Sequence, residues 1–193
     1  MHPLVLLAKL AVENYIKNGK IIDSFEGLPE ESLKEFSKER SGVFVTIEQS
    51  ENNKKALRGC IGTYLPIQDN VLKEVIYNAI SAATEDYRFY PIKKEELPFL
   101  FYTVYILSKP EEVKNLKELN PKKYGIIVKT VPINKGGDVV FNGHMALKSG
   151  LLLPDLPGVD TVEKQISICC RKGGIDPEKE KIVIYKFTVK KYN

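Results

Sequence analysis

The chain is arranged around the stretch Leu-Arg-Gly-Cys-Ile-Gly-Thr at residues 57–63. It combines a guanidinium, a thiol and two glycines. In a β-strand, alternation places Arg58 and Cys60 on one face and Leu57, Gly59 and Ile61 on the other. The aliphatic pair suits a core, and Gly59 leaves room for another backbone to approach closely. We therefore predict a strand that buries one face and offers Arg58 and Cys60 to a cleft or a partner.

Segments with helical periodicity alternate irregularly with segments typical of strands. Helices are predicted over residues 3–18, 29–37, 69–84 and 160–173, with Asp69 as the N-cap of the third and a capping box at 160–163 opening the fourth. Strands are predicted over residues 42–49, 57–63, 99–108, 124–130, 139–141, 145–153 and 182–190. Because several neighbouring strands are joined by apparent hairpins, the pattern favours an α+β fold with a largely antiparallel sheet and flanking helices.

Composition excludes several classes of protein. With 193 residues, of which 43% are hydrophobic, the chain can bury a substantial core, and its 28% of charged residues are spread along it. The net charge of +4 is mild, and no basic run is interleaved with aromatic residues, so nucleic-acid binding is not predicted. No apolar run approaches the ~18 residues of a membrane span. Three cysteines, an odd number, do not make a secreted disulfide framework, which favours the cytoplasm.

Cys60 admits two interpretations. A neighbouring cation such as Arg58 favours the reactive thiolate, whereas burial disfavours it, and cysteine often packs as a small hydrophobic side chain. The sequence gives neither histidine, His2 or His144, a placement that marks it as a base for this thiol. No pair of cysteines or histidines has the spacing of a metal site, and no phosphate-binding loop is present, so neither a metal nor a cofactor is predicted.

The connection at 85–91 brings charged and aromatic residues together. In one interpretation it is an ordinary loop, in which Arg88 pairs with its acidic neighbours and Phe89 anchors the turn. In the other, Glu85, Asp86 and Arg88 lie at the rim of the Cys60 site. The residues alone leave both interpretations open.

Residues 57–62 resemble the six-residue signature of the AMMECR domain family. Further resemblance to this family lies in the runs at 82–89, 122–128 and 150–163, in the same order along nearly all 193 residues. The last run is most similar to the stand-alone prokaryotic branch, which accompanies a Memo-like protein and a radical-SAM protein in the three-component AmmeMemoRadiSam system. The resemblance implies one AMMECR-type domain over 1–193, with two subdomains enclosing a cleft lined by the signature.

The resemblance also implies which residues form the site. Cys60 and Arg58 are the candidate catalytic residues. The candidate ligand- or partner-binding residues are Gly59, Gly62, Thr63, Glu85, Asp86 and Arg88. Relatives commonly carry an acidic residue where this chain has Thr103 or Tyr105, and the segment at 138–148 is longer than usual for the stand-alone branch.

Three functions follow from these residues. In the first, the chain is a binding or adaptor component that acts with the Memo-like and radical-SAM proteins through the Arg58–Cys60 face. In the second, it is an enzyme with Cys60 as nucleophile or redox thiol, and Arg58 holds a small anionic substrate by its planar fork. In the third, the signature serves only to form a tight hairpin. The lack of an evident general base favours the first.

Overall fold

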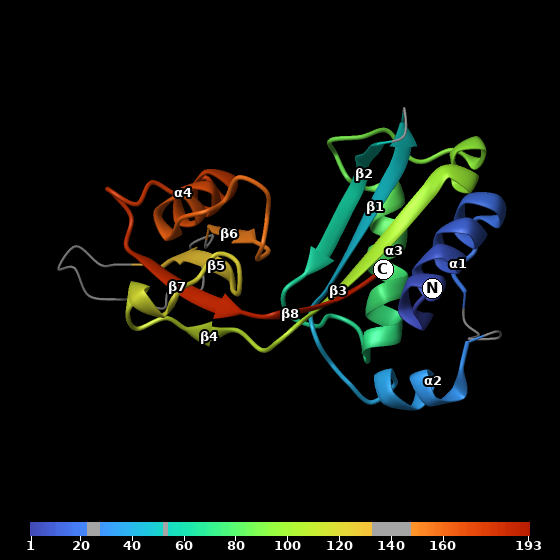
Figure 1. Ribbon diagram of the computed structural model, residues 1–193, viewed down its shortest axis with the longest axis horizontal. Coiled ribbons are helices and arrows are strands. Elements are labelled where there is room, and N and C mark those ends of the chain that lie inside the picture. Colours follow the sequence, from blue (N-terminus) through green and yellow to red (C-terminus); the bar gives the residue numbers. More distant parts are fainter. Residues whose placement is uncertain (23–27, 52–53, 133–147) are drawn as a thin grey trace. The chain divides into compact units, whose positions relative to one another are not determined.

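The computed structural model describes residues 1–22, 28–51, 54–132 and 148–193. Figure 1 shows their helices and strands, which divide into two compact units. The first unit comprises Met1–Leu107 with Lys190–Asn193, and the second comprises Ser108–Val189. Each unit contains a four-stranded sheet built from antiparallel pairs. The predicted α+β class with antiparallel sheets is confirmed.

The first unit packs helices against a sheet of order β2-β1-β3-β8. Its elements, in chain order, are α1 (Pro3–Asn18), α2 (Glu30–Phe36), β1 (Val43–Glu51), β2 (Lys54–Thr63), α3 (Val71–Thr84), the short 3-10 helix η1 (Lys94–Phe99), β3 (Leu100–Leu107) and β8 (Val189–Tyr192). Helices α1 and α3 contact each other, and both contact the sheet. Strand β2, which carries the signature, lies at one edge of the sheet.

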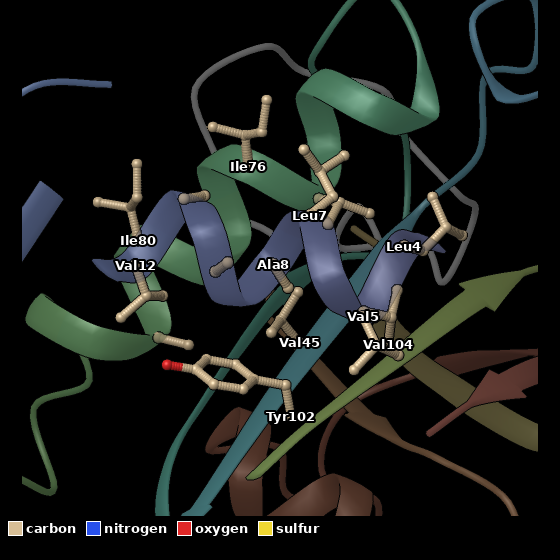
Figure 2. Packing of buried hydrophobic residues seen from close by; sticks show 14 of the residues in the cluster. Leu4, Val5, Leu7, Ala8, Val12, Val45, Ile76, Ile80, Tyr102 and Val104 are labelled. Carbon is tan, nitrogen blue, oxygen red and sulfur yellow. The ribbon is translucent and has the colours of Figure 1, made fainter. Parts of the chain in front are cut away.

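The core of this unit lies between these helices and one face of the sheet (Figure 2). Alternate residues of β1 point into it, because successive side chains of a strand lie on opposite faces. Val43, Val45 and Ile47 are fully buried, whereas Phe44 and Thr46 lie between them in sequence and are only partly buried. Phe44 and Thr46 therefore lie on the opposite face, where they pair with Gly62 and Cys60 of the signature.

The ends of α1 and α3 show how well helix boundaries are encoded. Helix α1 begins with a proline and ends at Gly19, whose φ of 68° is left-handed, as predicted. Helix α3 ends at Thr84 as predicted, but the prediction that Asp69 caps its start is wrong. The Asn70 side chain accepts the hydrogen bond from Lys73 N at 3.0 Å, and Asp69 pairs instead with the Lys73 ammonium at 2.6 Å.

The second unit has a sheet of order β4-β7-β5-β6. Its elements are β4 (Glu111–Glu112), the short 3-10 helix η2 (Leu116–Glu118), β5 (Gly125–Thr130), β6 (Ser149–Leu152), α4 (Val162–Gly173) and β7 (Ile182–Phe187). Helix α4 packs on β5 and β6, and its N-cap is Thr161 rather than the predicted Asp160. The predicted strand at 139–141, His144 and all but the last residue of the atypical segment 138–148 lie outside the described residues.

The strand predicted at 182–190 is two strands that belong to different sheets. Strand β7 ends at Phe187 in the second unit, and β8 begins at Val189 and pairs in the first sheet. Thr188 lies between them, where its N–H donates to Ser108 Oγ at 3.0 Å and its carbonyl accepts from Ser108 N at 2.9 Å. Strand-like residues continue across the break, so the sequence pattern does not reveal the change of sheet. Among the described residues, no helix is long and apolar enough to cross a membrane.

Candidate functional site

The signature strand β2 contains a β-bulge at Arg58. Gly59 lies opposite Ile47 of β1, and the next pair joins Leu57 to Glu48, so Arg58 is an extra residue with no counterpart in β1. The alternation of faces is therefore interrupted at Arg58. Leu57 has 42% of its surface exposed, and the prediction that it faces the core is wrong for this reason.

Gly59 brings β2 against helix α3. A Cβ at this position would overlap the carbonyl oxygen of Ala82, so only glycine allows the strand and the helix backbone to lie this close. The predicted close approach is confirmed. Gly62 plays a similar part on the other face, where a Cβ would overlap the ring of Phe44.

Arg58 is held by groups from two segments that follow α3. Its Nε donates to Glu96 Oε1 at 2.7 Å and its Nη2 to Glu96 Oε2 at 3.1 Å, a two-pronged ion pair. Its Nη1 donates to the carbonyl of Tyr90 at 2.8 Å. Every nitrogen of the guanidinium thus donates within the protein, and Arg58 ties β2 to the loop at 85–91 and to η1.

The electrostatic environment of Glu96 favours this ion pair. Burial acts to raise the pKa of Glu96, but the hydrogen bonds from Arg58 and from the backbone N–H of Lys93 outweigh it, so the pKa is lowered. The Arg58 and Glu96 side chains are 15% and 20% exposed, so the pair is largely shielded from water. Glu96 was not predicted as a site residue, and nothing in the sequence connects it with Arg58.

Asp86 and Arg88 cover the outer edge of β2 at Cys60. Asp86 Oδ2 accepts from the backbone N–H of Cys60 at 2.8 Å, and Arg88 Nη2 lies 3.4 Å from the carbonyl oxygen of Cys60. The two side chains bind each other through Arg88 Nη2 and Asp86 Oδ2 at 2.6 Å, and through Arg88 Nε and Asp86 Oδ1 at 2.9 Å. The pair therefore offers the strand an acceptor and a donor, as a neighbouring strand would.

The Asp86 carboxyl is ionised at neutral pH. Its side chain is almost completely buried. The hydrogen bond from Arg88, assisted by those from the backbone N–H groups of Cys60 and Arg88, lowers the pKa of Asp86 to about 2 against the opposing effect of burial. The two interpretations of residues 85–91 thus describe one arrangement, because Arg88 pairs with its acidic neighbour and both lie at Cys60.

Two other predicted residues lie in different surroundings. The Glu85 side chain is exposed, and its backbone N–H donates to Ser81 O at 2.7 Å at the end of α3. Thr63 Oγ1 donates to Glu74 Oε1 at 2.5 Å, while Glu74 Oε2 accepts from the backbone N–H groups of Ile67 and Gln68. Glu74 is 1% exposed and holds the turn after β2. The sequence signal that could have predicted a structural role for Glu74 is its position within the apolar stripe of α3. Whether any of these residues binds a ligand remains a prediction.

The thiol of Cys60 lies on the sheet face opposite the helices. Its Sγ is 3.2 Å from Thr46 Oγ1 on β1. Tyr105 of β3 is nearby: burial raises the pKa of Tyr105, and the adjacent Cys60 and Glu48 act in the same direction. The phenol therefore stays protonated and can donate a hydrogen bond. The Thr46 hydroxyl and the Tyr105 phenol thus both lie close to the Cys60 thiol.

The remaining cysteines and histidines are used elsewhere. Cys169 and Cys170 are buried in the second unit, and burial raises the pKa of both thiols, that of Cys169 to about 12. His2 accepts from Leu4 N at the start of α1 and stacks on Tyr192 at 4.0 Å. Within the described ranges, no three His, Cys, Asp or Glu side chains gather as a metal site would require. Of the three thiols, Cys60 is the most accessible.

A pocket of about 490 Å³ lies in the second unit. Its lining residues are Glu163, Ile166, Ser167, Cys170, Arg171, Ile175 and Pro177. None of them is a predicted site residue. The predicted cleft lined by the signature remains a prediction.

A family model described as AMMECR1 matches residues 5–192, across both units. The chain belongs to the AMMECR1 family. A Thermotoga maritima relative is 44% identical to this AMMECR1-family chain over 191 residues, covering 99% of the chain and 97% of the relative. A longer Clostridium acetobutylicum relative is 38% identical, and the match covers 98% of this chain but 36% of that protein.

Among solved structures, an uncharacterised protein of Pyrococcus horikoshii is similar to this AMMECR1-family chain with a TM-score of 0.76 and 32% sequence identity. The match covers 97% of this chain and 88% of that one. The resemblance inferred from residues 57–62 and the later runs is therefore confirmed at the level of the family.

Proposed function

We propose that this AMMECR1-family protein is a binding or adaptor component that acts in the cytoplasm with a Memo-like protein and a radical-SAM protein. The contact is made around Arg58 and Cys60. One observation carries the proposal: the charged groups next to the signature bind each other. Arg58 is held by Glu96, and Asp86 is held by Arg88 and by the backbone of Cys60. Such a network builds a preorganised surface.

The acidic group that contacts the Cys60 backbone also favours binding. The Cys60 thiol itself lies 3.2 Å from the Thr46 hydroxyl. Asp86, whose carboxylate accepts a hydrogen bond from the backbone N–H of Cys60, has its pKa lowered to about 2. This value is far below the range that suits a general base near pH 7.

The alternative is an enzyme in which Cys60 is the nucleophile or redox thiol. It is favoured by the partial exposure of Cys60 on a sheet face beside Thr46 and Tyr105. The role of Arg58 in holding an anionic substrate would then require its guanidinium to leave Glu96. That exchange has a cost, because hydrogen bonds to charged groups contribute roughly 1.5–3 kcal/mol each.

The two functions are separated by measuring the affinity of the purified chain for the purified Memo-like and radical-SAM proteins. Glu96→Gln should weaken binding by about tenfold, because it removes the charge that fixes Arg58 and the loop. The matched control is Glu95→Gln, an exposed neighbour in η1, which should bind as the unaltered protein does. Cys60→Ser should also bind within about twofold, a change under 0.5 kcal/mol.

The enzyme alternative makes a different forecast for the reconstituted three-protein mixture. If Cys60→Ser binds normally but abolishes a turnover that the unaltered protein supports, the thiol does chemistry and the adaptor proposal is wrong. If the unaltered protein binds neither partner, the proposal also fails.

A further inference from the structure

We propose that the loop at residues 85–91 is a docking surface for a folded protein, with Tyr87 and Tyr90 as its anchoring side chains. This inference rests on the proposed binding function and names the surface that performs it. Both tyrosines lie on a loop that the signature strand holds in place. The loop and the signature thus form one connected surface, although they lie more than twenty residues apart in sequence.

The two tyrosine side chains are left in solvent. Tyr87 is 94% exposed and Tyr90 is 89% exposed. Tyrosine is usually at least partly buried, since its ring is a large apolar surface. The two rings on this short loop therefore leave apolar surface exposed to solvent in the folded chain.

The loop itself is well anchored, so the exposure does not come from a loose segment. The backbone N–H of Ile92 donates to Ala83 O at 2.9 Å, and that of Phe89 donates to Asp86 O at 2.9 Å. Arg58 donates to the carbonyl of Tyr90 at 2.8 Å. Ile92 is 4% exposed and fixes the end of the loop in the core.

Phe89 adds a further point of attachment. Both Arg58 and Arg88 lie over its ring, with guanidinium carbons 6.0 and 5.4 Å from the ring centre. The loop therefore turns one aromatic residue toward the arginines and leaves the tyrosines on either side of it free. A loop fixed in this way loses little conformational entropy when a partner covers it, which favours affinity.

The chemistry of the loop favours a protein partner. Tyrosine and arginine are among the residues most enriched at the centres of protein interfaces, and the loop carries Tyr87, Arg88 and Tyr90 together. Its charges are balanced: Glu85, Asp86, Glu95 and Glu96 stand against Arg58, Arg88, Lys93 and Lys94. A single-stranded nucleic acid or an anionic membrane needs a clear excess of positive charge. The partner surface that fits offers apolar slots for two phenol rings, with acceptors for their hydroxyl groups.

The test compares Tyr87→Ala/Tyr90→Ala with Tyr77→Ala, a tyrosine on α3 that is 49% exposed and lies outside the loop. Affinity for the purified Memo-like and radical-SAM proteins is measured by titration calorimetry. The double variant should lose at least 30-fold in affinity for one of them, the size expected for hot-spot residues, while Tyr77→Ala should change it by less than about twofold. Urea unfolding should show the same midpoint for the unaltered protein and the double variant, because the rings of Tyr87 and Tyr90 are already in solvent.

The outcomes are distinct. If the unaltered protein binds a partner and the double variant binds it equally well, the docking surface is wrong and the proposed function stands. If the unaltered protein binds neither partner, both proposals fail. Two further arms use a labelled 20-nucleotide single-stranded RNA and phosphatidylserine vesicles. Binding of either probe by the unaltered protein, with loss in the double variant, would overturn the protein partner in favour of that ligand.

Discussion

Among single residues, Asp86 connects the most parts of the site. Its carboxylate joins the end of α3 to the backbone of Cys60 and receives two hydrogen bonds from the Arg88 side chain. Removing water from a carboxylate is costly unless such partners replace it. The partners here favour the ionised form strongly enough that the folded state should depend on the charge of Asp86.

This dependence predicts an acid transition. The pKa of Asp86 is lowered from 3.8 to about 2, so ionised Asp86 stabilises the folded state above pH 4, and this contribution is lost as the pH falls from 4 to 2. Its size is at most about 2 kcal/mol, since Arg88 is partly exposed. In Asp86→Asn the free energy of urea unfolding should therefore fall less between pH 4 and pH 2. Glu85→Gln, which alters an exposed neighbour, should retain the full decrease. Equal decreases in all three proteins would contradict the assignment.

The residue contacts differ in how far the sequence could predict them. Asp86 and Arg88 are two positions apart, so their pairing follows from local sequence, and the family resemblance linked them to Cys60. Arg58 and Glu96 are 38 positions apart. Their contact depends on the bulge that turns Arg58 out of the strand pattern, and a single inserted residue leaves no periodic signal. The sequence therefore predicted that Arg58 is a candidate site residue, but not that Glu96 is its partner.

At the scale of elements, helix α3 organises the surroundings of the signature. The backbone of Gly59 packs against Ala82, and the Thr63 hydroxyl donates a hydrogen bond to Glu74. The end of the helix leads directly into the loop at 85–91. Glu74 lies in the first turn of α3, so the start of the helix has to be well defined for this carboxylate to reach the turn after β2. The N-cap is thus connected to the geometry near the signature.

The cap can be tested directly. Asn70→Ala should lower the free energy of unfolding by about 1 kcal/mol, because it removes the side-chain acceptor for Lys73 N. Asp69→Ala loses an exposed pair with Lys73 and should lower it by clearly less than Asn70→Ala does. Urea denaturation of the two variants measures both effects. A larger effect at Asp69 than at Asn70 would restore the cap predicted from the sequence.

The helices and strands were largely predictable because their apolar periods are long and regular. The ends of α1 and the end of α3 follow from proline, glycine and the apolar pattern. The start of α3 was misplaced by one residue, since aspartate and asparagine are both good caps and occur side by side. The break between β7 and β8 was missed because a strand pattern records burial on a face and not the sheet to which the face belongs.

At the scale of the whole molecule, the chain passes from the first unit to the second after Leu107 and returns after Val189. Strand β8 then completes the first sheet at the edge opposite β2. Tyr192 packs there against His2 and Phe36, with ring centres 4.0 and 6.3 Å away. The last residues of the chain are therefore part of the core built by the first ones.

Deleting residues 190–193 should destabilise the first unit selectively. The deletion leaves one edge of β3 unpaired and removes the Tyr192 ring, so amide hydrogen exchange should accelerate in β3 and α1. Exchange in β5 and α4 should stay unchanged, because their core lies in the second unit. Lys191→Ala, an exposed change on the same strand, serves as the control. Equal acceleration in both units would show that they unfold as one.

The cover that Asp86 and Arg88 form over β2 bears on how molecules of this protein behave toward one another. An edge strand with free N–H and C=O groups is a template onto which another chain can add by backbone pairing. At Cys60 both groups are already occupied by the side-chain pair. The same contacts that hold the Cys60 backbone also block this part of the edge from pairing with another chain. A substitution that removes the Asp86 contacts should therefore disturb the site and also promote aggregation.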